Sequence, residues 1–88
     1  MPELSRFFGI IISLRYNDDG KHHLPHIHAT YAGYEAVVSF DGELLQGALP
    51  KTQLSMVIAW VTIHRSELDA AWIKASRNEK IDKIKPLK

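Results

Sequence analysis

The stretch HIHATYAGYEAVVSFDG, residues 26–42, decides the fold of this chain. Residues 26–31 and 34–41 both alternate between two kinds of side chain, and only Ala32-Gly33 separates them. This period-two pattern predicts two antiparallel strands joined by a two-residue turn. Because the facing pairs on one side are all apolar, the register is self-consistent. These facing pairs are Tyr31–Tyr34, Ala29–Ala36 and Ile27–Val38.

A second turn signal, Asp41-Gly42, follows the hairpin and predicts a further strand over residues 43–49. We expect Leu45 of that strand to lie opposite Val38 on the apolar face. Gly47 lies further along, is expected opposite Ala36, and has no side chain. It therefore leaves a thin place that a helix can approach closely.

Upstream, residues 6–16 alternate with one fully apolar side, which predicts a single strand. Downstream, apolar positions recur at helical spacing, which predicts one long helix from Pro50 or Lys51 to about Arg77. We therefore expect an α+β fold, an antiparallel four-stranded meander packed on one long C-terminal helix. Residues 79–88 are expected to form a basic tail or a fifth edge strand. The sheet face under the helix is expected to carry Ile27, Ala29, Val38, Phe40 and Leu45.

The composition bounds the class of protein. Eighty-eight residues with 45% hydrophobic and 24% charged side chains are typical of one globular domain, here residues 1–88. The net charge of +1 is too small to indicate nucleic-acid binding by bulk electrostatics, and the lack of cysteine excludes disulfides and thiolate ligands. With no secretion signal and no apolar run of membrane-spanning length, we expect a cytoplasmic protein without a membrane partner.

The predicted helix carries a second apolar patch on its back, made of Met56, Trp60 and Ile63. Two explanations stay open. Either the helix bends near His64-Arg65, or its back packs on another subunit. Because exposed patches with Trp and Met are typical of interfaces, we expect these three residues to bind a protein partner or a second copy of the chain.

Four of the five histidines lie within residues 22–28, and His26 and His28 occupy positions i and i+2 of a predicted strand. Side chains at that spacing point the same way, so this pair is a candidate ligand set for a divalent transition metal. A third ligand would have to come from His22, His23, Glu35 or Asp41. Alternatively, the pair is a plain polar sheet surface, or it works with Arg15 and Glu35 in proton transfer or anion binding.

Two further groups of charged residues admit two interpretations each. Arg65 falls within the apolar stripe of the helix beside His64, where it needs a carboxylate or phosphate partner unless it snorkels to solvent. The tail concentrates basic residues, which suits either a solvated chain end or contact with nucleic acid or an acidic partner. These basic residues are Lys80, Lys83, Lys85 and Lys88.

Several short motifs recur in one combination along nearly the whole chain. They are Arg6-Phe7-Phe8-Gly9-Ile10, Pro25-His26-Ile27-His28-Ala29, Tyr31-x-Gly33, Gly47-x-Leu49-Pro50, Trp60-x-x-x-His64-Arg65-x-Glu67-Leu68, Trp72 and Ile84-x-Pro86-Leu87. In this combination the chain resembles the bacterial domain-of-unknown-function family numbered 4160. It departs from the family pattern at Leu24-Pro25, where two prolines are usual.

The resemblance implies a β-rich α+β domain that forms one half of a small two-gene cassette of the toxin–antitoxin type. It implies no settled activity. By this analogy the candidate catalytic residues are His26, His28, His64 and Arg65. We therefore expect an interaction module from a toxin–antitoxin-like or regulatory pair. The alternative is a small histidine-dependent, or metal-dependent, hydrolase or nuclease that uses the Pro25-His26-Ile27-His28 face.

Overall fold

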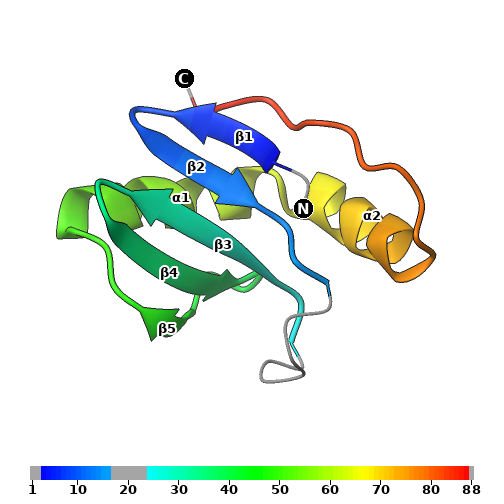
Figure 1. The fold of residues 1–88 in the computed structure, drawn as a ribbon, viewed down its shortest axis with the longest axis horizontal. Coiled ribbons are helices and arrows are strands. Elements are labelled where there is room, and N and C mark those ends of the chain that lie inside the picture. The colour runs from blue at the N-terminus through cyan, green and yellow to red at the C-terminus, as the bar shows by residue number, and fades with distance from the viewer. Residues whose placement is uncertain (1–2, 17–23, 88) are drawn as a thin grey trace.

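Five strands and two helices make up the structure, a computed structural model that describes residues 3–16 and 24–87. The strands form one antiparallel sheet in chain order, and both helices lie behind it in Figure 1. The α+β class is therefore confirmed, although the sheet has five strands instead of four. The elements are β1 (Glu3–Phe7), β2 (Ile10–Ser13), β3 (His26–Tyr31), β4 (Tyr34–Ser39), β5 (Leu44–Gly47), α1 (Lys51–Ile63) and α2 (Arg65–Ser76).

The β3–β4 hairpin has the predicted register. Tyr31 faces Tyr34, and the two apolar pairs further along the strands also lie as expected. Ala32 and Gly33 both have positive φ angles, of 46° and 87°, as a two-residue type I′ turn requires. On the other side of the same strands, His26 faces Ser39 and His28 faces Val37.

The prediction of a single strand over residues 6–16 is wrong, because the chain reverses at Phe8-Gly9. These two residues have φ angles of 49° and 79°, and Phe7 of β1 faces Ile10 of β2. A two-residue turn places Phe7 and Ile10 on the same face of the sheet, so the alternation changes phase there. Phe7 and Phe8 are both apolar, so the sequence pattern does not show this change. Phenylalanine also rarely adopts a positive φ, which hides the turn further.

The β4–β5 connection is one residue longer than predicted. The Ser39 amide donates a hydrogen bond to the Glu43 carbonyl at 2.8 Å, so the turn contains Phe40, Asp41 and Gly42. Val38 therefore faces Leu44, and the predicted pairing with Leu45 is wrong. The register then shifts between Val38 and Val37, which restores the predicted register at Gly47.

Gly47 faces Ala36 as predicted, but the chain that approaches it is not a helix. A Cβ atom at Gly47 would overlap the carbonyl oxygen of Glu35 and crowd the main chain of Ala36. The glycine also has a φ of +81°, a conformation that other residues rarely adopt. Close approach of the neighbouring strand therefore explains this glycine.

The predicted single long helix is divided at His64, whose φ and ψ of −104° and 25° interrupt the helical path. A straight helix over residues 51–76 would be about 39 Å long, whereas the longest Cα extent of the domain is 34 Å. The bend keeps Leu68 and Ala71 of α2 on the core, where both are buried. Of the two explanations left open, the bend is the one that the structure has.

The predicted apolar patch on the back of the helix includes Trp60. In the structure Trp60 is fully buried and is not part of a surface patch. Its ring lies 5.9 Å from that of Phe7, and its Nε1 donates to the Lys85 carbonyl at 2.8 Å. Met56 is half-buried against the core, and Ile63 alone of the three is largely exposed, at 66%. The predicted patch is therefore wrong for Trp60, because the tail covers the side of α1 that the sheet does not.

The tail, residues 77–87, contains no strand or helix in the described chain. It leaves α2 through Asn78, which has a φ of 58°, and runs back alongside β1 (Figure 1). The Ile84 amide donates to the Leu4 carbonyl at 2.7 Å, and the Ile84 side chain is buried. The tail is therefore docked on the β1 edge without forming a strand there.

Candidate functional site

The two motif histidines lie side by side in β3 on the sheet face turned away from α1, here called the histidine face. Their ring centroids are 5.3 Å apart, and the His26 ring lies 5.5 Å from that of Trp72 in α2. The Nδ1 atom of His26 is 2.6 Å from the Leu24 carbonyl oxygen. Because a carbonyl can only accept, this nitrogen carries the proton in the neutral ring.

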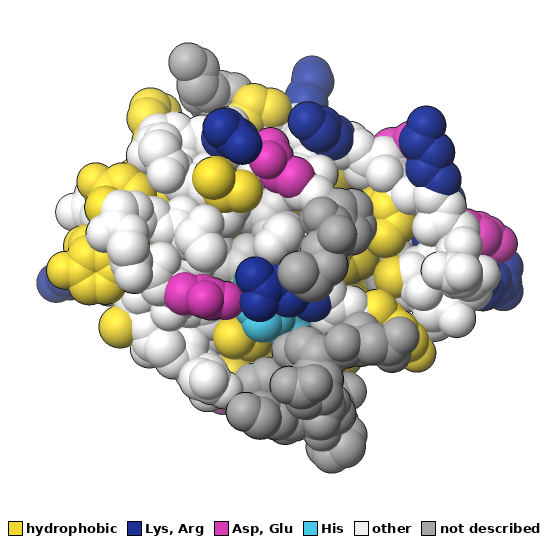
Figure 2. Space-filling model, viewed as in Figure 1, with side chains coloured by type: hydrophobic (Ala, Val, Ile, Leu, Met, Phe, Trp, Pro, Cys, Tyr) yellow, Lys and Arg dark blue, Asp and Glu magenta, His cyan; other side chains and the backbone are white. Residues whose placement is uncertain are grey.

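Glu35 connects the histidine face to Arg15. Its Oε2 atom lies 3.4 Å from Nδ1 of His28 and accepts a hydrogen bond from Nη1 of Arg15 at 3.2 Å. Arg15 therefore lies on the same side of the sheet as the histidines. Figure 2 shows a small histidine surface between basic and acidic side chains on this face. The Glu35 side chain is half exposed, so the cluster lies at the boundary with solvent.

An open polar sheet surface is nevertheless the wrong description of the histidines themselves. His26 is 0% exposed and His28 is 5% exposed. Trp72 is half-buried and places its ring against those of Tyr16, His26 and Phe40. The pair is therefore an internal part of the fold that reaches solvent only at the edge of His28.

The expected ligand set for a metal is incomplete among the described residues. In residues 3–16 and 24–87 no three His, Asp or Glu side chains are grouped as metal ligands. Asp41, one candidate third ligand, is bound to Arg65, and Glu35 faces Nδ1 of His28. His22 and His23, the other two candidates, lie outside the described residues.

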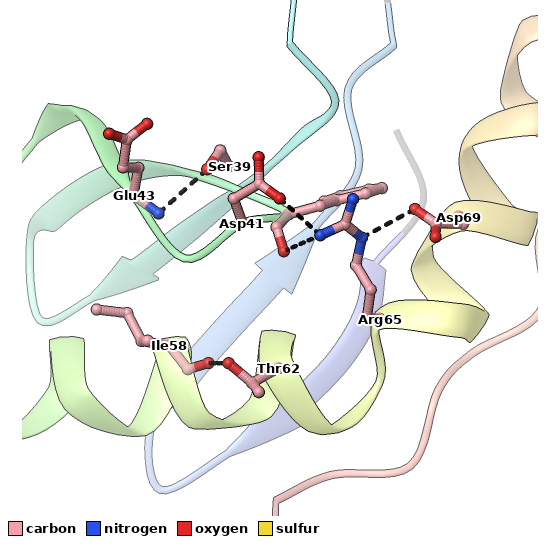
Figure 3. A network of polar contacts seen from close by, with 8 residues as sticks. Ser39, Asp41, Glu43, Ile58, Thr62, Arg65 and Asp69 are labelled. Atoms are coloured by element: carbon pink, nitrogen blue, oxygen red, sulfur yellow. Dashed lines mark hydrogen bonds and ion pairs between the residues drawn. The ribbon is translucent and has the colours of Figure 1, made fainter.

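Arg65 acts as a clamp between the β4–β5 turn and α2, as Figure 3 shows. Its Nη1 donates to the Phe40 carbonyl at 3.0 Å and to Asp41 at 2.8 Å, and its Nε donates to Asp69 at 3.1 Å. The hydrogen bond with Asp41, then that with Asp69, raises the pKa of Arg65 above its usual value. The structure combines the two interpretations of Arg65, because it has carboxylate partners and its side chain is half exposed beside the break at His64.

His64 belongs with this second group and not with the motif histidines. Its Nδ1 lies 2.6 Å from Glu67 Oε1, and its ring is 5.4 Å from that of Trp60. The four candidate catalytic residues therefore form two clusters, His26 with His28 and His64 with Arg65. The connection between the clusters is apolar, because Phe40, whose carbonyl binds Arg65, places its ring against Trp72.

The tail lysines that the structure describes all point into solvent. Lys80, Lys83 and Lys85 are exposed, and Lys83 Nζ is 3.9 Å from Glu3 Oε2. Lys88 lies outside the described residues. The basic strip is therefore available for contact with an acidic partner, although Glu3 partly neutralises it.

A surface that the sequence analysis missed lies where the β1–β2 and β3–β4 turns come together. We call it the hairpin-tip surface and define it by Phe8, Gly9, Tyr31, Gly33 and Tyr34. Phe8 is 56% exposed and Tyr34 48% exposed. A hollow beside them is lined by both turns and reaches Thr30 and Glu35. Recognising Phe8-Gly9 as a turn would have revealed this surface, because each turn then presents an aromatic residue next to a glycine.

These features define a small α+β domain with a buried histidine pair on one sheet face and exposed aromatic residues at its hairpin tips. The chain belongs to the family described as Domain of unknown function (DUF4160), whose model matches residues 9–73. The matched segment contains both histidine motifs, whereas β1 and the tail lie outside it. No curated protein and no solved structure matches the chain. Neither α1 nor α2 has the length and apolar character that a membrane span requires.

Proposed function

We propose that this domain is a cytoplasmic protein-interaction module, one component of a toxin–antitoxin-like or regulatory two-gene pair. The observation that carries the proposal is the hairpin-tip surface. Tyrosine and phenylalanine are enriched at the centres of protein interfaces, where they anchor in pockets of the partner. Tyr34 lines a hollow that can receive a partner's side chain in return, and Phe8 precedes Gly9, another residue of its lining.

The contacts of the motif residues favour a binding function over a catalytic one. His26, His28, Trp60 and Arg65 all bind other parts of the same chain, and the first three are buried. A substrate needs access to a catalytic side chain, and the buried histidines His26 and His28 offer little access. The exposed tail lysines fit an acidic surface on the partner or a nucleic acid held by the pair.

The experiment is co-expression of this chain with the product of the neighbouring gene, followed by size-exclusion chromatography. We expect the two proteins to elute together, and Tyr34→Glu to abolish co-elution because it places a charge in the interface. Ile73→Glu is the matched control, since Ile73 is equally exposed at 52% but lies on α2. Elution of the wild-type chain as an unaccompanied monomer would count against the proposal.

A second candidate function is histidine-dependent hydrolysis of a nucleic acid or another ester, with or without a divalent transition metal. One observation favours it. The Nδ1 atoms of His26 and His28 face a carbonyl and a carboxylate, the groups that usually orient metal-binding imidazoles through their second nitrogen. The Nε2 atoms would then hold the metal or take a proton.

Metal analysis of tag-free protein tests this second candidate. It predicts about one metal ion per chain in wild type, and its loss in the His26→Ala/His28→Ala double variant. The double variant must keep its circular dichroism spectrum for the comparison to be valid. If neither protein takes up zinc, manganese or nickel, the metal-dependent form of this candidate is wrong.

A further inference from the structure

We infer that the β1 edge is a binding site for an extended peptide, which the chain's own tail occupies in this structure. This site is distinct from the hairpin-tip surface. We call it the tail seat and define it by Leu4 of β1 and Trp60 of α1, whose described hydrogen bonds hold residues 84 and 85 of the tail. Its occupant is an extended segment with aliphatic side chains at three-residue intervals, the spacing of Ile81, Ile84 and Leu87.

The main-chain contacts are those of a bound peptide. The tail passes along β1 without becoming a strand (Figure 1). Its described main-chain bonds to the seat are the Ile84 amide to the Leu4 carbonyl, at 2.7 Å, and the Lys85 carbonyl to the Trp60 indole, at 2.8 Å. These two bonds hold adjacent residues through main-chain atoms, so they do not depend on the side chains of the tail.

The side chains of the tail form two groups, aliphatic ones that pack on the core and lysines that face solvent. Ile84 is 6% exposed and joins the core, and Ile81 and Leu87 are half-buried against it. Lys80, Lys83 and Lys85 point outward. Recognition by spaced apolar anchors plus main-chain bonds is a common mode of peptide binding.

The tail is also incompletely packed. A hollow of about 180 Å³ separates it from α2, lined by Ala70, Ala71 and Lys74 on one side and Ile81 and Ile84 on the other. The ion pairs that flank it are long and exposed, at 4.0 Å for Lys74–Asp82 and 3.9 Å for Lys83–Glu3. An occupant with so few bonds can leave while the sheet and helices stay folded.

The test uses the full chain and a labelled synthetic peptide of residues 79–88 as the probe. Ile84→Asp places a charge at a buried anchor and should detach the tail. We expect this variant to bind the peptide at least about 10-fold more tightly than the wild-type chain does, because its seat is empty. A peptide carrying the same Ile84→Asp change should not bind. Ile63→Asp, a matched change at an exposed position, should behave as wild type.

A folded Ile84→Asp chain that does not bind the peptide would overturn the inference. If that variant does not fold, hydrogen exchange on the wild-type chain decides. We expect the Ile84 amide to exchange at least about 100-fold faster than the amides of β3, because the tail opens without global unfolding. Equal rates at the two places would show that the tail is an integral part of the fold and would overturn the inference.

Discussion

Gly47 and Gly33 have similar backbone conformations, but glycine is needed at the two positions for different reasons. Both have φ angles above +80°, but a Cβ at Gly33 meets nothing within 4 Å, whereas a Cβ at Gly47 overlaps the Glu35 carbonyl. Gly33→Ala should therefore cost only the backbone strain, about 1–2 kcal/mol of unfolding free energy. Gly47→Ala should cost more than about 3 kcal/mol, because β4 and β5 must also separate. Urea unfolding of the two variants measures both, and equal losses would contradict the explanation.

Arg65 is predicted to be a structural clamp. Arg65→Lys keeps the charge but cannot reach the Phe40 carbonyl, Asp41 and Asp69 together, so the melting temperature should fall. Arg6→Lys is the control, since Arg6 binds only the exposed Glu3 among its described contacts, and it should melt close to wild type. Equal melting temperatures for Arg65→Lys and wild type would mean that the clamp contributes nothing to stability.

The pH dependence of this clamp follows from the direction of the pKa shift. Because the folded state raises the pKa of Arg65, its contribution is present below the unfolded value and is lost only as the pH rises through the folded value. Both values lie far above neutrality. The difference in melting temperature between wild type and Arg65→Lys should therefore stay constant between about pH 6 and 9. A difference that changes steeply within that range would assign the effect to another group.

The elements differ in how far their sequence patterns predict them. The β3–β4 register follows from alternation plus a two-residue turn, and the facing pairs lie as predicted. The same rule misses the Phe8-Gly9 hairpin, because Phe7 and Phe8 are both apolar and hide the change of phase at the turn. It also misses the longer Phe40–Gly42 turn, which changes the partner of Val38 from Leu45 to Leu44.

The errors in the predictions for the helical region and the candidate site have a different cause. Helical spacing places Trp60 away from the sheet, and local pattern alone cannot reveal that the tail returns to cover it. Likewise, the spacing of His26 and His28 predicts correctly that they are adjacent, but not that Trp72 from α2 packs on the pair. Contacts between segments distant in sequence decide burial, and no short-range pattern encodes them.

Trp60 should therefore behave as a core residue that also holds the tail. Trp60→Phe keeps an aromatic ring against Phe7 but removes the indole donor to the Lys85 carbonyl. We expect a loss of about 1–3 kcal/mol of unfolding free energy, together with faster hydrogen exchange at Ile84. An interface residue would show neither effect, so unchanged stability and exchange would restore the surface interpretation.

In the whole molecule, the motif residues hold the domain's own elements together, and other residues remain exposed for contact with a partner. Histidines, Arg65 and Trp60 join β3, the β4–β5 turn, α2 and the tail to one another. The exposed aromatic residues Phe8 and Tyr34 lie instead at the tips of two hairpins, at the rim of the sheet. This division is the basis for assigning partner binding to the hairpin-tip surface.

The most direct test is the dissociation constant between the purified domain and the product of the neighbouring gene, for wild type and Tyr34→Glu. If Tyr34 anchors the interface, the variant should bind at least about 30-fold more weakly, with an unchanged melting temperature and with Ile73→Glu equal to wild type. Equal affinity of wild type and Tyr34→Glu for that partner would contradict the assignment of the hairpin-tip surface as the binding site.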